Sequence, residues 1–201
     1  MKAILINGSS NEGGNTYQML ADLRTHLGGR GVETELAWAC DLLAELDTPH
    51  CTACSDSCEG SCYAGTRLEA FFSRMARADI IVAASPVYFG TVSAPLKGLW
   101  DLTRALRRSG SLLYTVGAAA SVGAGRFGGQ ETTVRAIHDM MLIQGMIIVG
   151  DSSPAGIGHQ GVSAAAPAEE DSDARKRLKV LADGVCDVAA ATVDLRRQWR
   201  R

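Results

Sequence analysis

Short apolar runs alternate with amphipathic stretches along the whole chain. The apolar runs predict five strands, which cover residues 3–6, 32–38, 79–84, 112–116 and 146–149. Apolar positions that recur every three or four residues predict five helices, which cover residues 17–27, 68–75, 95–106, 131–143 and 173–196. The segments 41–67, 117–129 and 150–168 lack such a period and are predicted to be irregular or loops.

The alternation of strands and helices predicts the architecture. Each strand–helix–strand unit forms a right-handed crossover, so the strands run parallel in one sheet. We therefore expect an α/β fold, a doubly wound five-stranded parallel sheet with helices on both faces. The length of 201 residues fits a single domain over 1–201. Such sheets bind ligands at the carboxyl ends of their strands, so the chemistry is expected in the loops that follow strands.

The composition is that of an ordinary globular protein, with 46% hydrophobic and 21% charged residues. A net charge of -2 gives no indication of nucleic acid or of an anionic membrane surface. The first apolar run is too short for a signal peptide, and no stretch approaches the ~20 apolar residues of a membrane helix. We expect a cytoplasmic protein, in which thiols stay reduced.

The loop after the first strand reads Gly-Ser-Ser-Asn-Glu-Gly-Gly-Asn-Thr over residues 8–16. Backbone N–H groups and the helix dipole at a helix start attract an anion. Further donors come from the side chains of Ser9, Ser10, Asn15 and Thr16. The loop contains neither a Walker A nor a Gly-x-Gly-x-x-Gly motif, and it has no Lys or Arg, so it suits a phosphate monoester. The alternative is a glycine-rich turn in which Thr16 caps a helix.

This loop resembles the phosphate loop of the NADPH-dependent FMN reductase family, whose relatives include the iron-sulfur flavoproteins and the flavodoxin-like quinone reductases. The resemblance covers residues 1 to about 150 and implies a flavodoxin-like fold with bound FMN. Matched by position, it implies that the FMN phosphate is contacted by Ser9, Ser10, Asn15 and Thr16.

Two further loops resemble flavin-binding segments of the same family. The segment after the third strand, which the family uses to line the isoalloxazine ring, contains Pro86, Val87, Tyr88, Phe89 and Gly90. Its aromatic residues supply flat apolar surface, although aromatic packing under a helix is the alternative. In the third loop, Ser121 is expected at the pyrimidine edge of the flavin. Arg126 is expected either to stabilise charge on the reduced ring or to lie exposed in solvent.

Four of the six cysteines lie in a loop at about 50–63, with the spacing C-x2-C-x3-C-x3-C. Four thiolates can bind zinc or an iron-sulfur cluster. The location resembles that of the cysteine motif of iron-sulfur flavoproteins, which implies a [4Fe-4S] cluster on Cys51, Cys54, Cys58 and Cys62. The third cysteine is shifted by one residue from the more common family spacing. Free or disulfide-bonded thiols near the flavin remain the alternative.

The resemblance implies an FMN-dependent oxidoreductase that passes electrons from NAD(P)H through FMN to a quinone, flavin, metal or protein acceptor. Because the cofactor carries the chemistry, we expect no catalytic acid or base among the side chains. The alternative is a non-enzymatic electron carrier of flavodoxin type. Relatives complete the flavin site across a subunit interface, so a homodimer or homotetramer is expected. The sequence leaves open the acceptor, the pathway and the choice between NADH and NADPH.

Overall fold

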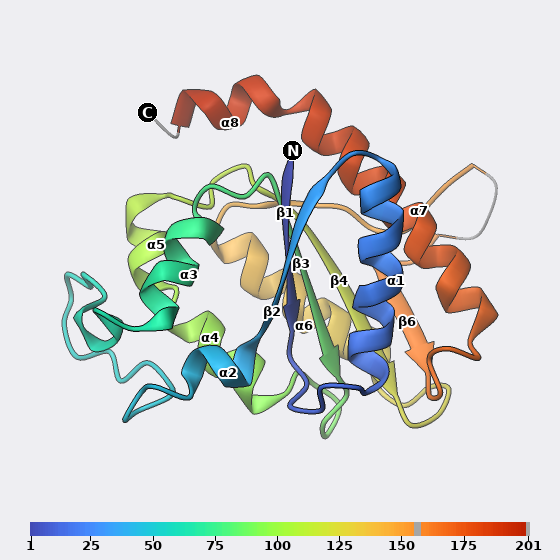
Figure 1. Cartoon of the computed structure of the whole chain (residues 1–201), viewed down its shortest axis with the longest axis horizontal. Coiled ribbons are helices and arrows are strands. Elements are labelled where there is room, and N and C mark those ends of the chain that lie inside the picture. Colours follow the sequence, from blue (N-terminus) through green and yellow to red (C-terminus); the bar gives the residue numbers. More distant parts are fainter. Residues whose placement is uncertain (155–157, 200–201) are drawn as a thin grey trace.

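A computed structural model describes residues 1–154 and 158–199. The described residues form one six-stranded parallel sheet, in which five strands follow the order β2-β1-β3-β4-β5 and β6 pairs with β4 (Figure 1). The strands are β1 (Lys2–Asn7), β2 (Glu33–Trp38), β3 (Ile80–Pro86), β4 (Val116–Gly123), β5 (Ile147–Ile148) and β6 (Val162–Ala165). This order is that of flavodoxin, and it confirms the predicted doubly wound parallel sheet.

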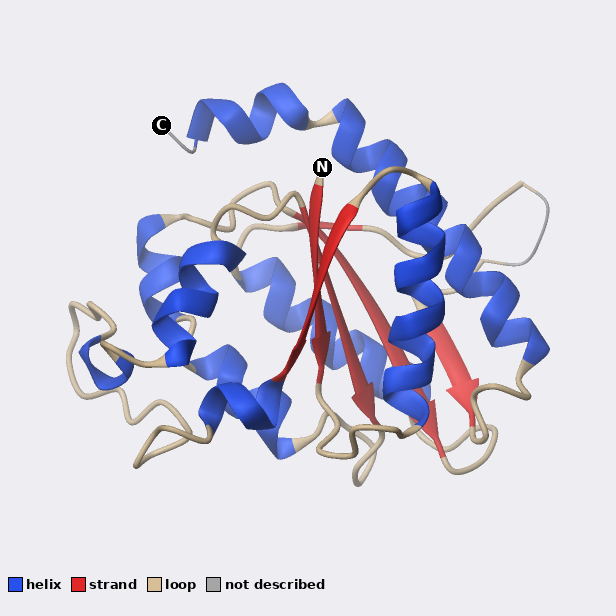
Figure 2. Ribbon diagram, in the orientation of Figure 1, coloured by secondary structure: helices blue, strands red, loops and turns tan. Residues whose placement is uncertain are grey.

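Helices cover both faces of the sheet (Figure 2). The helices are α1 (Asn15–Gly29), α2 (Ala39–Leu43), α3 (Arg67–Met75), α4 (Ala94–Asp101), α5 (Arg104–Ser109), α6 (Gln130–Ile143), α7 (Ser172–Ala191) and α8 (Val193–Trp199), with a 3-10 turn at Ser61–Tyr63. Apolar residues of α1 and α7 pack on one face of the sheet, and those of α2 to α6 pack on the other.

The residues of the central strands alternate between these two layers. In β1, Leu5 joins the layer of α1 and α7, whereas Ile4 and Ile6 join the opposite layer. In β3, Val82 and Ile81 divide in the same way. Because helices cover both faces, every one of these positions must be apolar, which explains why these strands appear in the sequence as continuous apolar runs.

The fourth strand differs from the prediction for residues 112–116. Leu112 lies in a turn closed by the N–H of Thr115, and β4 begins only at Val116 and continues to Gly123. The stretch Ala118–Ala120, which was predicted to belong to a loop, is fully buried and pairs with Val82–Ala84 of β3. Small residues have weak strand propensity alone, but a central strand under closely packed helices accommodates them.

Two further differences concern the C-terminal half. The predicted loop 150–168 contains β6, which pairs with Ala120–Gly123, while β5 pairs with Val116 and Gly117. β5 and β6 thus share one edge of β4, and β6 is too short to give a recognisable period. The predicted helices 95–106 and 173–196 are each divided, after Asp101 and at Thr192.

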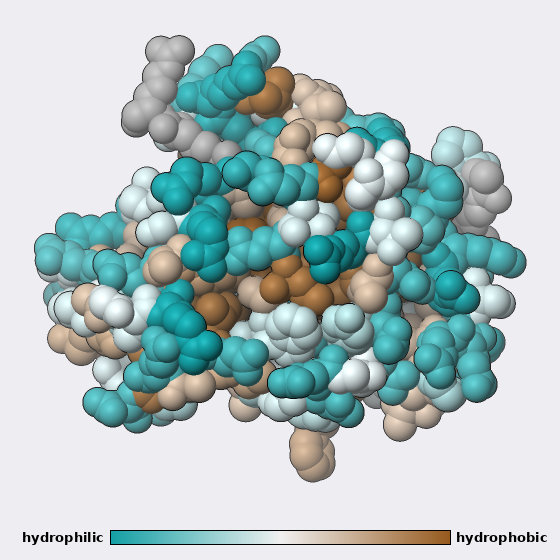
Figure 3. Space-filling view, in the orientation of Figure 1, coloured by the Kyte–Doolittle hydropathy of each residue, from teal (hydrophilic) through white to brown (hydrophobic). Residues whose placement is uncertain are grey.

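No helix among the described residues is both long and apolar enough to span a membrane. Hydrophilic side chains cover most of the face seen in Figure 3. An apolar side chain projects from its lower edge, which is the edge at which the strands of Figure 1 end.

Candidate functional site

Three loops meet at the carboxyl edge of the sheet, and hydrogen bonds connect them. The N–H of Gly8, in the β1–α1 loop, donates to the carbonyl of Ala84 at 2.8 Å. Ser93, which ends the β3–α4 loop, donates from its hydroxyl to the carbonyl of Gly8 at 2.6 Å. Thr132 at the start of α6 donates to the carbonyl of Gly90 at 2.8 Å. The structure therefore brings together the three loops in which the sequence predicted a ligand.

The β1–α1 loop is braced by its own side chains. The N–H of Ser9 donates to Oδ1 of Asn7 at 2.9 Å, and the N–H of Asn11 donates to Oγ of Ser9 at 3.1 Å. A Cβ on Gly8 would lie 2.9 Å from the carbonyl oxygen of Ala84, so only glycine fits there. Helix α1 follows with Gly14 at its N-cap, which has no side chain to cap the first N–H groups. Those N–H groups are available to an anion.

The predicted phosphate contacts lie at different depths in this loop. Ser9 and Thr16 are buried, whereas Ser10 is exposed. Asn15 accepts a hydrogen bond on Oδ1 from the N–H of Ala168 at 2.8 Å, which leaves its Nδ2 as a donor. Their contacts with a phosphate stay predictions.

Asn7 is a residue that the sequence reasoning missed. Its side chain is fully buried at the end of β1, and its Nδ2 has no partner among the described residues. A buried donor without a partner is costly, and an anion in the loop would offer it an acceptor. The signal that could have revealed it is a single polar residue that ends an otherwise apolar strand.

The β3–α4 loop forms a tight turn that projects from the protein. Tyr88 and Thr91 exchange two backbone hydrogen bonds, at 3.0 and 3.2 Å, across Phe89 and Gly90. Both turn residues have positive φ, +50° and +79°, which is strained for phenylalanine. Phe89 is completely exposed and Tyr88 is 55% exposed, whereas Pro86 and Val87 are half-buried. The turn therefore presents aromatic surface instead of packing it in the core.

In the β4–α6 loop, Gln130 is the central hydrogen-bonding residue, which the sequence reasoning did not single out. Its Nε2 donates to the carbonyls of Gly125 and Ala164 at 2.6 and 3.1 Å, and its Oε1 accepts from the N–H of Gly128 at 2.8 Å. Ser121 is fully buried and donates to the carbonyl of Gln130 at 2.8 Å. The contact of Ser121 with a flavin stays a prediction. What the structure shows is a hydroxyl that holds the start of α6 against β4.

The tip of this loop is exposed. Phe127 has a φ of +59° and is fully exposed, and Arg126 beside it is also exposed. Two fully exposed phenylalanines, Phe89 and Phe127, thus lie on neighbouring loops of one edge. Isolated exposed apolar residues are common, but two of them at strained turn tips indicate a binding surface for a ligand or a partner.

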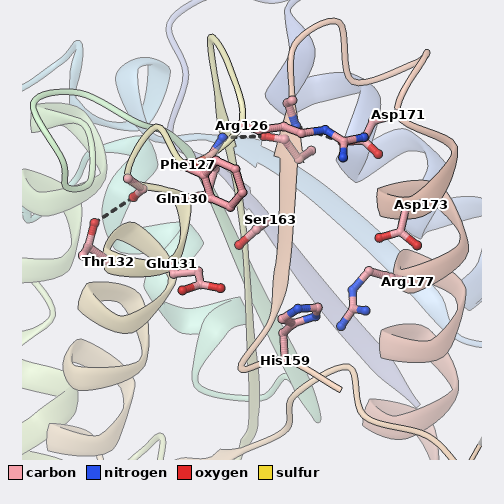
Figure 4. A pocket seen from close by; sticks show the side chains of 13 residues that line it. Arg126, Phe127, Gln130, Glu131, Thr132, His159, Ser163, Asp171, Asp173 and Arg177 are labelled. Carbon is pink, nitrogen blue, oxygen red and sulfur yellow. Dashed lines mark hydrogen bonds between the residues drawn. The ribbon is translucent and has the colours of Figure 1, made fainter. Parts of the chain in front are cut away.

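A pocket of about 570 Å³ lies beside the third loop, between α6, β6 and α7 (Figure 4). Its lining includes Arg126, Phe127, Glu131, His159 and Asp173, but no residue of the phosphate loop or of the Tyr88 turn. The pocket is therefore adjacent to the three-loop site without being part of it.

The four cysteines of the loop line a different pocket, of about 470 Å³. All are free thiols, with Cys51 and Cys58 half-buried and Cys54 and Cys62 exposed. Burial, reinforced by the neighbouring thiols, raises the pKa of Cys62. No group of three or more His, Cys, Asp or Glu side chains forms a metal site among residues 1–154 and 158–199. The four thiols therefore share one pocket, and a bound metal would have to draw them closer to one another.

The cysteine segment is held at its base by α4. Gly98 of that helix is buried, and a Cβ there would lie 2.5 Å from the carbonyl oxygen of Pro49. The segment itself, teal in Figure 1, extends from the side of the molecule formed by α2 to α5. The same pocket is lined by Arg104, which places a positive charge near the thiols.

Comparison with known proteins gives consistent matches. Residues 1–160 match the model of the NADPH-dependent FMN reductase family. An iron-sulfur flavoprotein of Methanocaldococcus jannaschii is 42% identical over 168 residues, covering 82% of this chain and 84% of that protein. An iron-sulfur flavoprotein of Methanosarcina thermophila is 37% identical, covering 94% and 95%. The crystal structure of RosB, solved with 8-demethyl-8-formylriboflavin-5′-phosphate, is similar in fold, with a TM-score of 0.75 and 14% identity over 96% of this chain and 81% of that one.

Proposed function

The chain belongs to the NADPH-dependent FMN reductase family, and from this premise we propose that it passes electrons from NAD(P)H through FMN to a cysteine-bound [4Fe-4S] cluster and an external acceptor. The family makes it an NAD(P)H-dependent FMN oxidoreductase. The cluster, the acceptor and the individual contacts are our proposals. The observation that carries the FMN site is the buried Nδ2 of Asn7, which has no partner among the described residues and lies at the entrance to the β1–α1 loop.

The phosphate end of FMN is bound by neutral donors in this proposal. The N–H groups at the start of α1, the hydroxyls of Ser9, Ser10 and Thr16, and Nδ2 of Asn15 would surround the phosphate oxygens. Asn7 would contribute its unpaired donor from below the loop. Hydrogen bonds to charged groups are about twice as strong as neutral ones, so such a cradle can bind a dianion without Lys or Arg.

The ring end of FMN would lie between the second and third loops. The segment of Pro86, Val87, Tyr88, Phe89 and Gly90 would line the isoalloxazine. Ser121 shapes the loop at the ring edge through Gln130, and Arg126 is exposed at the tip of that loop. When bound, FMN supplies the redox chemistry by accepting a hydride from NAD(P)H and returning the two electrons to the acceptor. The protein binds and orients the cofactor and excludes water from it.

We expect a second copy of the chain to complete this site. Phe89 and Phe127 are fully exposed at the edge that would bind the ring, so a lone chain would leave the flavin open to solvent. A homodimer or homotetramer that buries Phe89 would close it. Light scattering with and without FMN measures the oligomeric state, and a monomer at all concentrations would contradict this part of the proposal.

The cluster would be bound by Cys51, Cys54, Cys58 and Cys62. Their position around one pocket supports this assignment, as does the absence of disulfides among them. Closing the cluster would draw the loop inward, because the thiols in the described structure do not yet form a ligand group. Arg104 would then lie close to a negatively charged centre.

The test is an anaerobic preparation of the full chain. We expect stoichiometric FMN, about four irons and four sulfides per chain, and flavin bleaching on addition of NAD(P)H. Steady-state turnover with a quinone would give saturation kinetics. Cys54→Ser and Cys58→Ser should remove the iron and keep the FMN, whereas Cys40→Ser, outside the pocket, should keep both. Fully flavinylated, active protein without iron would overturn the cluster, and an absence of flavin would overturn the whole proposal.

A further inference from the structure

The pocket beside the third loop has walls of mixed chemistry (Figure 4). Glu131 projects into it from α6, and Asp173 and Arg177 project from α7 on the opposite side. His159 and Ser163 lie between them, and Arg126 extends across the other end towards Asp171. The pocket thus offers carboxylates on two facing walls and a cation near the flavin loop.

Some of these groups are already committed to the fold. Asp171 accepts from the N–H groups of Ala165 and Ala174, at 2.9 and 3.1 Å, and so caps α7. Arg177 pairs with the buried Asp151 at 2.5 Å. These residues shape the pocket, and their charges are largely used within the protein.

Three charged side chains are not committed in this way. Arg126, Glu131 and Asp173 are exposed, and none forms an ion pair or a side-chain hydrogen bond within the described part of the chain. The fully exposed ring of Phe127 lies at the same rim. One ligand could therefore contact a cation and two carboxylates that have no ion-pair partner among the described residues, together with a flat apolar surface.

This combination matches the outer half of a nicotinamide dinucleotide. The pyrophosphate requires a cation, for which Arg126 is available beside the flavin loop. The ribose of the adenosine carries two adjacent hydroxyls, and carboxylates are the acceptors that proteins use for a free 2′-hydroxyl. The adenine requires a flat apolar surface such as that of Phe127. The position of the pocket also fits this ligand, because the pocket adjoins the loop at which the nicotinamide would meet the flavin.

We infer that this pocket takes the adenosine half of the nicotinamide cosubstrate and that Glu131 and Asp173 make the protein select NADH over NADPH. The inference rests on the proposed function. The 2′-hydroxyl of NADH donates to a carboxylate, whereas the 2′-phosphate of NADPH cannot donate and is repelled by two negative charges. Arg177 offers NADPH little compensation, since Asp151 already neutralises it.

The measurement is the rate of flavin reduction by each nucleotide in the anaerobic holoprotein. We expect kcat/KM for NADH to exceed that for NADPH by about tenfold or more, from the hydrogen bond to a charged acceptor. The double variant Glu131→Gln with Asp173→Asn should bring the ratio close to one, mainly through KM for the two nucleotides. Added salt should reduce the discrimination in the unaltered protein, because the repulsion of the 2′-phosphate is screened.

Asp139→Asn is the matched control, because this exposed carboxylate is on the same helix but does not line the pocket. It should leave the ratio unchanged. A preference for NADPH that is lost in Arg126→Gln would overturn the inference and assign the pocket to the 2′-phosphate. An unchanged ratio in the double variant would also overturn it. If neither nucleotide reduces the flavin while dithionite does, the proposed function itself fails.

Discussion

Gly98 lies where helix α4 supports the base of the cysteine segment, which makes Gly98→Ala a precise perturbation. The added Cβ would lie 2.5 Å from the carbonyl oxygen of Pro49, whereas ordinary contact begins at 3.4 Å. The nearest side-chain atom, Cδ1 of Leu43, is at 3.6 Å and needs no adjustment. The backbone at Pro49 must therefore move by about 0.9 Å, and the first cysteine lies two residues further on.

The expected cost is the difference between two effects. Overpacking against backbone costs about 1–3 kcal/mol, and replacing glycine by alanine inside a helix returns about 0.5–1 kcal/mol. We therefore expect the free energy of unfolding to fall by about 1 kcal/mol, within a range of about 0–2.5 kcal/mol. The displaced loop should also hold less iron per chain, while FMN content stays unchanged because the atoms nearest to the added Cβ belong to Pro49 and Leu43 and not to the flavin loops.

Urea unfolding and the ratio of iron to FMN measure these two effects. Gly28→Ala in α1 is the control, because a Cβ there meets no atom within 4 Å. It should stabilise the protein by about 0.5–1 kcal/mol and leave iron unchanged. If Gly98→Ala behaves like this control in both measurements, the close approach of Pro49 does not position the cysteine segment, and the reasoning is refuted.

Three further predictions concern other parts of the fold. Gln130→Leu should lower stability by about 1–3 kcal/mol in urea unfolding and weaken FMN binding in fluorescence titration, because the buried carbonyl of Ala164 and the carbonyl of Gly125 lose their donor. Asp151→Asn should cost about 3–5 kcal/mol, since Arg177 keeps its charge in a buried site, and an unchanged unfolding midpoint would contradict this. Burial raises the pKa of Tyr63 to about 12, so its stabilising contribution is complete below pH 10 and is lost as the pH rises towards 12. Tyr63→Phe should remove that loss from pH-dependent unfolding curves.

The sequence by itself determined the architecture and the edge of the sheet at which a ligand is expected. Strands buried on both faces must be apolar at every position, so runs such as Ala3–Ile6 and Ile80–Ala84 identified the centre of the sheet. Parallel strands bring the loops after β1, β3 and β4 to one edge, and those loops carried the family's motifs. The hydrogen bonds of Gly8, Ser93 and Thr132 show that these three loops meet.

Only the tertiary structure decided the limits of β4, the existence of β6 and the roles of individual polar residues. Pairing with β3 makes a strand of Ala118–Ala120, and pairing with β4 makes a strand of Val162–Ala165. In both cases the neighbouring strand and the covering helices are distant in sequence. The same holds for polar side chains. Asn7 and Gln130 do not stand out in the sequence. The role of Gln130 depends on hydrogen-bond partners in other elements, and that of Asn7 on a buried donor without a partner among the described residues. The local pattern indicates which positions prefer burial. Hydrogen-bond partners and pocket walls arise from packing between distant elements, and no short stretch of sequence encodes that packing.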